Sequence, residues 1–503
     1  MPKNVNPGVI YEEPVVIKRI RRRGALEEVT GSGTVAAAVM VVAALLALVV
    51  ANSPAYEAVE HFLVQPLSIG FGAFAASLTV EAFVNDFLMA VFFLLVGIEL
   101  KYEMTVGQLR RPRQAALPML AAVGGVCAPA LIYLAFNMGG LANGWAVPIA
   151  TDIAFALGIA SLLGDKISPA TKVFFQTLAI ADDILAIVVI AVAYGQSPNI
   201  AWCAAAAIVV LVLWGLNRAK VYSLKPYLLV GIVLWVCMYN SGIHATLAGV
   251  ILAFALPSRS DVRLDEFGAW LGQKAQLLED RYDEDAHILG QHSFTEGALR
   301  VESVIHHVTP PLERMEHYIS VPVNFLILPI FAFVNAQVHL VGTDFLTIVS
   351  DPVTIGVYLG AVLGKPLGIF LVTFVLVKIG FAKLPEQMDW VQVGAIGIMG
   401  GLGFTMSILI SGLAFDAAAE VMAAKCAILM GSFTSAILGI LFTNAAFALR
   451  DKKGAGEDEG ASVGDGSPAP PPHPPAAARA PSNTVRSKGY PRRSNQRSTI
   501  TRP

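Results

Sequence analysis

PATKVFFQTLAIADDILAIVVIAVAY, residues 169–194, is a run of apolar residues long enough to cross a bilayer as one helix. Two adjacent carboxylates, Asp182 and Asp183, stand at its centre. A charged side chain in mid-membrane costs at least about 2.5–3.5 kcal/mol on insertion scales, so two in succession need a compensating interaction. Pairing with a basic neighbour for structural reasons is one explanation, and an ion-binding site is the other. Two consecutive acids favour the ion-binding site.

The composition places most of the chain in lipid. Of its 503 residues, 55% are hydrophobic and only 14% are charged, whereas a soluble domain has about a quarter of charged residues. A net charge of −2 does not favour a nucleic-acid partner. The four cysteines show no paired spacing, so they predict neither a disulfide framework nor a zinc site. The polar N-terminus does not resemble a cleavable signal peptide.

Apolar runs of spanning length recur along the chain and predict about twelve transmembrane helices. They lie at 34–52, 84–101, 115–136, 145–163, 169–194, 201–217, 227–240, 243–257, 321–337, 353–379, 390–415 and 422–449. The interval 59–80 is apolar but interrupted by Pro66 and glycines, so we expect a non-spanning extracytoplasmic segment there. The predicted fold class is an all-α polytopic membrane protein.

Basic residues segregate to alternate loops of this arrangement. Counted from a cytoplasmic N-terminus, the inward loops carry lysines and arginines such as Arg110, Arg111 and Lys220. Outward loops such as NMGGLANGW and GQSPNI contain neither residue type. Because the positive-inside rule demands this segregation, we predict both termini on the cytoplasmic side. Lys425, near the outer start of the last helix, is the nearest exception.

Polar segments flank and interrupt the transmembrane part. Residues 1–30 form a basic arm, which serves as a topology anchor or lies on anionic lipid. The transmembrane part comprises 31–257, with about eight helices, and 312–450, with about four. Between them, 258–311 combines helical apolar spacing with charge, so we expect a partly helical cytoplasmic insert. Residues 451–503 are rich in proline, serine and glycine and predict a disordered cytoplasmic tail.

The carboxylate pair suits a competition between protons and cations. Neighbouring residues of a helix point about 100° apart, so Asp182 and Asp183 face different partners. Burial penalises the charged form of a carboxylate, and an acid poised in this way can exchange a proton for a cation. Sodium and lithium are hard ions that favour carboxylate, carbonyl and hydroxyl oxygens. We therefore predict a site at which H⁺ and Na⁺ exclude each other.

Two predicted spans are interrupted. In WAVPIATDIAFALGIASLLG, residues 145–164, the pair Thr151–Asp152 follows Pro148. In GIMGGLGFTMSILISG, residues 397–412, Thr405 follows Gly400, Gly401 and Gly403. Broken helices expose carbonyls and dipole ends at membrane depth, and two of them in corresponding halves of a chain indicate a transporter site between inverted repeats. An ordinary proline kink is the alternative for the first segment. Similarity between the halves is too weak to establish a repeat from sequence alone.

A lysine also stands in mid-membrane. Lys365, in AVLGKPLGIF, needs a counter-ion at that depth, and Asp182 can supply one. We predict a salt bridge between them that breaks when sodium or protons arrive. A purely structural pair is the alternative, and the two interpretations are compatible.

Several motifs together resemble the NhaA family of bacterial Na⁺/H⁺ antiporters. They are NDFLMAVFFLLVGIELK, ATDIAFALGI, IADDILAI, SGIHATLAGVI, LILPIFAFVNA, GKPLGI and GLGFTMSILI. The match runs from about residue 30 to 450, without the polar insert. It implies twelve helices with inverted repeats and two crossed, discontinuous helices, here the fourth and eleventh. It also implies a bacterial cytoplasmic (inner) membrane protein that serves sodium and pH homeostasis, and it suggests a homodimer.

The resemblance also assigns the site residues. Asp183 and Asp182 would form the cation and proton site, with Thr151 as a further sodium ligand and Asp152 beside it. Lys365 would be the partner of Asp182.

The family has a cytoplasmic pH-sensing cluster as well. The residues that match it here are Glu99, His244, Glu316 and His317. Tyr102 stands where the family pattern has a basic residue, and Ser320 stands where it has a histidine. The pH of activation therefore does not follow from the resemblance, whereas the ion site matches throughout.

We accordingly expect a secondary antiporter, not an enzyme, that expels Na⁺ or Li⁺ against more than one inward H⁺ per ion. Its partners would be sodium, protons and membrane lipid, and no cofactor is expected. The chain has no nucleotide-binding loop of the GxxxxGK[ST] type, so ATP is not the expected energy source. A passive cation channel is the alternative function. An intramembrane aspartyl protease is a remote one, because its YD and GxGD motifs do not occur at a suitable depth.

Overall fold

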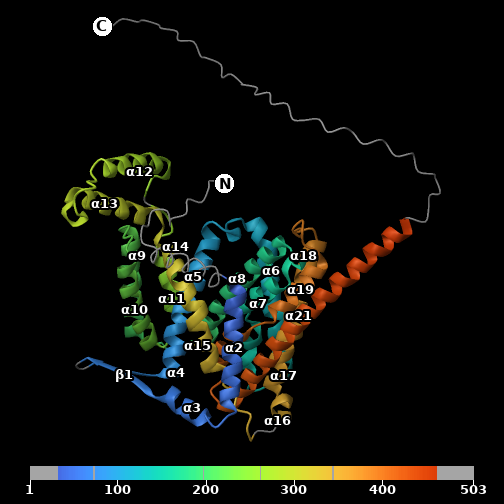
Figure 1. Ribbon diagram of the computed structural model, residues 1–503. Helices are drawn as coiled ribbons and strands as arrows, with labels where there is room; N and C mark the ends of the chain where they lie inside the picture. The colour runs from blue at the N-terminus through green and yellow to red at the C-terminus, as the bar shows by residue number, and fades with distance from the viewer. Residues whose placement is uncertain (1–31, 72–73, 196–197, 261, 343–344, 462–503) are drawn as a thin grey trace, which may run out of the picture. The chain divides into compact units, whose positions relative to one another are not determined.

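The computed structural model describes residues 32–71, 74–195, 198–260, 262–342 and 345–461. The predicted basic arm and the predicted tail from residue 462 onward lie outside these ranges. The chain divides into two units, Met1–Leu449 and Arg450–Pro503, and everything below concerns the first unit unless stated. Its described part is almost entirely helical (Figure 1).

Within the described residues, ten helices are long and apolar enough to cross a membrane, and a bent helix pair makes an eleventh. The unbroken ones are α2 (Gly33–Ala51), α6 (Pro112–Phe136), α8 (Pro169–Ala193), α9 (Ile200–Arg218), α10 (Leu224–Ser241) and α21 (Ala418–Ala461). Three more contain a π-helical turn between two α-helical parts, namely α4–α5 (Val80–Ala82, Met89–Thr105), α14–α15 (Pro311–Pro322, Leu328–Asn335) and α17–α18 (Pro352–Leu359, Lys365–Lys378). The remaining two contain a break, namely a 3₁₀ segment (Ala142–Ile149) with α7 (Ile153–Leu162), and α19 (Trp390–Gly400) with α20 (Phe404–Ala414).

The polytopic helical class is confirmed, and the eleven spans coincide with eleven of the twelve predicted ones. The remaining prediction, 243–257, contains α11 (Leu247–Ala255), which has only nine helical residues. That length is under half of the about 20 residues that a spanning helix needs. Helix α11 instead lies flush against α5, because a Cβ on Gly97 would come within 2.8 Å of Ala253.

The interval 59–80 does not form a spanning helix. It contains the end of α3 (Tyr56–Val64) and then an antiparallel hairpin of β1 (Pro66–Phe71) and β2 (Phe74–Thr79). The sequence did not predict this hairpin, since apolar runs this short do not distinguish a strand from a helix. Pro66 occupies the first position of its strand, where the missing N–H is tolerated.

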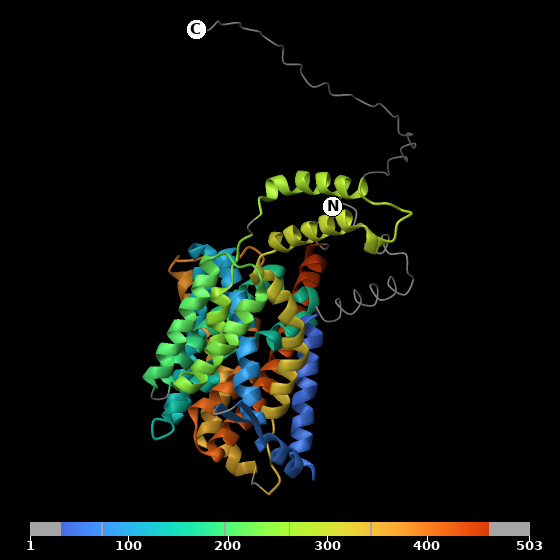
Figure 2. The ribbon, with the colours of Figure 1, turned by 90° about the vertical axis from the view of Figure 1, so that its left-hand side faces the viewer.

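The polar insert contains two helices, α12 (Leu264–Glu279) and α13 (His292–Val308). Figures 1 and 2 show them beyond one end of the helical bundle, with the hairpin at the opposite end. The backbone N–H of Leu312 donates to Pro257 O at 3.1 Å, so the two ends of the insert meet. At the other boundary, α21 continues to Ala461, past the predicted helix end at 449.

Helices α6 and α18 bring two backbones into contact. A Cβ on Gly124 would come within 2.5 Å of Gly368 O, so neither glycine has room for a side chain. In lipid, where the hydrophobic effect does not drive helix association, such small-residue contacts let helices pack by van der Waals forces. The contact fixes α18, whose first residue is Lys365, against the centre of the bundle.

Candidate ion-binding site

The two interrupted spans meet at their breaks. The 3₁₀ segment ends at Ile149, and α7 begins only after the extended residues Ala150–Asp152. Helices α19 and α20 are bent by 45° across a three-residue break after Gly400. The N–H of Asp152 donates to Leu402 O at 2.6 Å, and the Oγ1 hydroxyl of Thr151 donates to Gly400 O at 2.9 Å. The two discontinuous helices that the family resemblance implies are therefore present, and they are hydrogen-bonded to each other at their breaks.

Asp152 holds the starts of two half-helices together. Its Oδ1 accepts the N–H of Phe155 at 3.1 Å, which caps α7. Its Oδ2 accepts the N–H of Thr405 at 3.2 Å and the Thr405 hydroxyl at 2.7 Å, at the start of α20. Helix N-termini carry partial positive charge, so one carboxylate compensates both. Both oxygens of Asp152 are thus engaged by protein donors.

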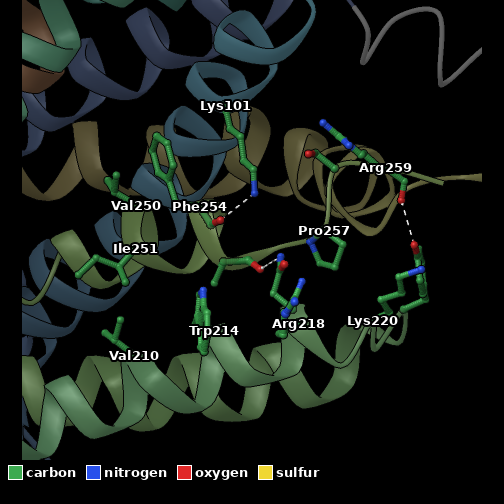
Figure 3. Close-up of a pocket in the computed structure, with 14 residues that line it drawn as sticks. Lys101, Val210, Trp214, Arg218, Lys220, Val250, Ile251, Phe254, Pro257 and Arg259 are labelled. Carbon is green, nitrogen blue, oxygen red and sulfur yellow. Dashed lines mark hydrogen bonds between the residues drawn. The ribbon is translucent and has the colours of Figure 1, made fainter. Parts of the chain in front are cut away.

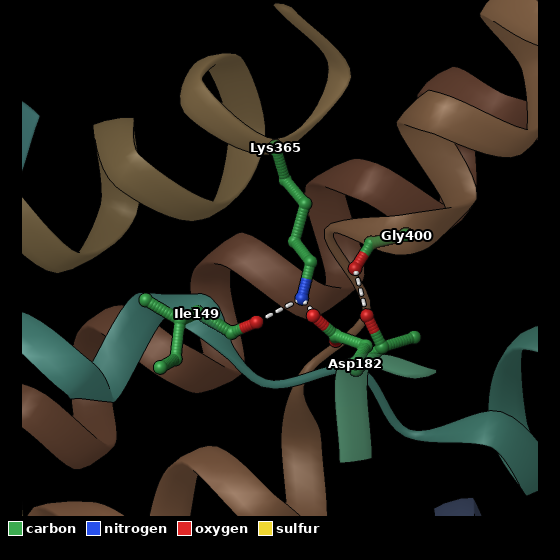
Figure 4. Close-up of polar contacts among 5 residues, drawn as sticks. Ile149, Asp182, Lys365 and Gly400 are labelled. Carbon is green, nitrogen blue, oxygen red and sulfur yellow. Dashed lines mark hydrogen bonds and ion pairs between the residues drawn. The ribbon is translucent and has the colours of Figure 1, made fainter. Parts of the chain in front are cut away.

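Asp182 forms the predicted ion pair. Lys365 Nζ donates to Asp182 Oδ2 at 2.6 Å, and the two side chains are 0% and 1% exposed, respectively. The same ammonium donates to the carbonyl of Ile149, the last residue of the 3₁₀ segment. Figure 4 shows Lys365 reaching both oxygens, with Gly400 of the second break nearby. The lysine therefore connects α8 and α18 to the end of a broken helix.

Asp183 differs from its neighbour in having no such partner. Its side chain is 4% exposed, and its Oδ1 accepts no hydrogen bond from the described residues. It lines a cavity of about 180 Å³, together with Thr151 and Asp152. The other polar residues around that cavity are Glu99, Gln176, Asn324 and Thr405. A buried carboxylate with an unused oxygen beside a cavity is suited to bind a cation or a proton.

Of the four residues expected to sense pH, Glu99 and Glu316 lie near each other, and His244 lies apart from them. Glu99 lines the same cavity as Asp183 and experiences the repulsion of the Glu316 carboxylate. His317 is exposed beside Tyr318, with ring centroids 6.3 Å apart. His244 lies in a second cavity of about 400 Å³ that Asp183 does not line, and its Nε2 is 2.9 Å from Tyr194 O.

The sequence alone did not single out the neutral oxygen donors of the cavity. Asn324, Gln176 and Thr405 had no predicted role. One signal was available for Asn324, which interrupts the apolar run VPVNFLILPIFAF. Among the described residues, no group of three or more His, Cys, Asp or Glu side chains could hold a resident metal ion. The donors at Asp183 are instead carboxylate, hydroxyl and amide oxygens, which suit a hard cation as transported cargo.

Comparison with known proteins agrees with this geometry. The chain matches the sequence model of a family described as Na⁺/H⁺ antiporter 1 over residues 27–443. It is 43% identical over 424 residues to the Na(+)/H(+) antiporter NhaA of Helicobacter pylori (strain HPAG1), covering 82% of this chain and 92% of the relative. The corresponding protein of Proteus mirabilis (strain HI4320) is 42% identical over 410 residues, covering 81% and 93%. That of Oleidesulfovibrio alaskensis is 41% identical over 404 residues, covering 80% and 89%.

The resemblance inferred from the motifs is thus confirmed over most of the chain. The matched region includes both broken helices, the carboxylate pair and the buried lysine. These features belong to a transporter and not to an enzyme. This multi-pass membrane protein is a member of the Na⁺/H⁺ antiporter 1 family.

Proposed function

We propose that the protein exchanges Na⁺ for H⁺ across a membrane, with Asp183 and Asp182 as the shared binding site. One observation carries the proposal: Asp183 is buried, has an unused oxygen and faces a cavity, while the adjacent Asp182 is held by Lys365. Two acids at one place admit either protons or a metal cation. Competition between the two occupants couples their movement.

The ion pair between Lys365 and Asp182 is the interaction with which sodium binding competes. With Lys365 bound to Asp182, Asp183 is the member of the carboxylate pair that lines the cavity. A sodium ion at Asp183 attracts the second carboxylate and competes with the ammonium for it. Thr151 provides a further oxygen, because a hydroxyl that donates to Gly400 O still has lone pairs to offer. Protonation of Asp183 removes its charge and releases the metal ion, and protonation of Asp182 likewise breaks the pair with Lys365.

Net charge movement is part of the proposal. If more than one proton enters for each Na⁺ or Li⁺ that leaves, the exchange gains about 2.3 kcal/mol per elementary charge per 100 mV of membrane potential. The potential alone then suffices to expel sodium without a pH gradient. Such coupling serves sodium and pH homeostasis, and Glu99 with Glu316 near the cavity would adjust the response to pH.

We place the protein in a bacterial cytoplasmic membrane with both termini inside, and we propose anionic lipid as a partner. A cavity of about 750 Å³ supports the lipid, because its lining contains four cationic side chains and, among the described residues, no carboxylate. The cations are Lys101, Arg218, Lys220 and Arg259, and apolar side chains that include Trp214 and Phe254 line the same cavity (Figure 3). Basic cavities of this kind between helices suit lipid headgroups. The homodimer suggested by the resemblance is a further proposal, which the oligomeric state in lipid nanodiscs tests.

The experiment is transport by purified protein in sealed proteoliposomes. We expect an imposed sodium gradient to drive proton movement in the opposite direction, and Asp183→Asn to abolish it while the variant keeps its thermal stability. Sodium flux without proton movement would indicate a channel. Normal exchange by Asp183→Asn would remove the site assignment.

A further inference from the structure

The span Pro311–Asn335 carries two asparagines that are used differently. Asn335 lies on α15, where its Nδ2 donates to Asn85 Oδ1 at 2.7 Å and to Phe331 O at 3.1 Å. This is the usual use of an amide in a membrane helix, where it joins neighbouring helices by hydrogen bonds. Asn324 makes no side-chain hydrogen bond to the described residues, although it lies in the same apolar span. Joining helices therefore does not explain Asn324.

The position of Asn324 indicates another use. It lies in the π-helical turn Val323–Ile327, directly after Pro322, and it lines the cavity that contains Asp183. A π-helical turn inserted in an α-helix changes the direction in which its side chains point, and such turns occur frequently at functional sites. Asn324 and Asp183 therefore line one cavity of about 180 Å³, which has room for about six waters at about 30 Å³ each.

The remaining oxygens of the cavity show what an amide would add. Asp152 has both oxygens occupied, and Thr151 and Thr405 use their hydroxyl hydrogens within the protein. Asp183 has an unused oxygen, but its single carboxylate supplies at most two ligands. A cation stripped of water needs several oxygen ligands. The Asn324 side-chain carbonyl would add a neutral oxygen, to which no donor of the described residues is hydrogen-bonded.

We infer that the side-chain oxygen of Asn324 is a ligand of the transported cation, completing the site at Asp183. This inference rests on the proposed exchange and adds a specificity-determining residue to it. An amide cannot bind a proton near neutral pH, so Asn324 favours the metal-bound state over the protonated state of Asp183. Its loss should weaken sodium binding more than proton binding.

The test compares Asn324→Leu with wild type in proteoliposomes over a range of sodium concentrations. Losing a ligand to a charged partner should raise the KM for Na⁺ about tenfold, with kcat within about twofold. Asn324→Gln, which keeps the carbonyl, should recover most of the sodium affinity. The matched control is Leu326→Ala in the same π-helical turn, whose side chain is 58% exposed and does not line the cavity, so its KM should be unchanged. Should Asn324→Leu fail to fold, Asn324→Ala carries the comparison.

A KM for Na⁺ equal to that of wild type in a folded Asn324→Leu or Asn324→Ala would overturn the ligand assignment. An equal loss of thermal stability and activity in all three Asn324 variants would also overturn it, since that pattern describes a structural role. The proposed exchange is tested separately, because in this assay wild type by itself shows whether sodium movement is coupled to proton movement.

Discussion

At the scale of single residues, Asp182 and Asp183 are adjacent in sequence but differ in their partners. Oδ1 of each acid accepts no hydrogen bond from the described residues, but Asp182 is paired through Oδ2 with Lys365 at 2.6 Å, whereas Asp183 lines the cavity. The sequence predicted this pair and its lysine because charges in mid-membrane are costly and therefore conspicuous. It did not reveal Asn324, because an amide carries no charge and does not stand out in an apolar run. Nor did the sequence predict that His244 and Glu99 line different cavities, since their positions depend on how the helices pack.

The buried ion pair gives a prediction for stability. Replacing either partner alone leaves an uncompensated buried charge, which costs about 3–5 kcal/mol. Lys365→Met and Asp182→Leu should each lower the melting temperature in detergent. The double variant should recover most of the loss, although it cannot transport. Melting temperatures of the four proteins measure this coupling. A double variant whose loss equals the sum of the two single losses would show that the pair contributes no coupling.

At the scale of elements, hydropathy located the spans but not their internal geometry. The glycines of GIMGGLGF predicted the α19–α20 break, and the pair Thr151–Asp152 predicted the other. The hairpin and the shortness of α11 were missed, because they depend on pairing and packing partners that lie elsewhere in the chain. The π-helical turns were also missed, because their extra residue leaves no mark in hydropathy.

The contact between the two breaks depends on Gly403. A Cβ there would come within 2.6 Å of Ala150 O, so Gly403→Ala must push the breaks apart. We expect the exchange rate to fall about tenfold or more, because displacements of about 1 Å at a site have effects of that size. Gly412, also on α20, has open space around it, and Gly412→Ala should exchange normally. Initial rates in proteoliposomes compare the two. Equal rates for both variants would contradict the role of the contact.

At the scale of the whole molecule, the insert and the ion site are separate. No described residue between 258 and 311 lines the cavity at Asp183. The insert joins the bundle through other contacts, including the Tyr222 hydroxyl donating to Arg259 O at 3.2 Å and the stacked rings of Tyr222 and His307, whose centroids are 5.1 Å apart. The sequence predicted this separation from composition, since polar and apolar segments alternate sharply at residue 257.

Removal of the insert is therefore expected to spare transport. Because Leu312 N–H and Pro257 O are hydrogen-bonded, a short glycine–serine linker can replace residues 259–309 without strain. The maximal exchange rate and the KM for Na⁺ should stay within about twofold of wild type, since insertions at such sites are tolerated. Rates in proteoliposomes at saturating sodium measure the effect. Loss of exchange in a stably folded deletion variant would make the insert part of the transport machinery.

The competition between sodium and hydrogen ions is tested most directly by adding Na⁺ to purified protein in weakly buffered detergent solution and recording the pH. Wild type should release protons on sodium addition, less at high pH where the acids are already ionised, and Asp183→Asn should release none above the buffer background. Sodium binding by wild type without any proton release would contradict a shared site.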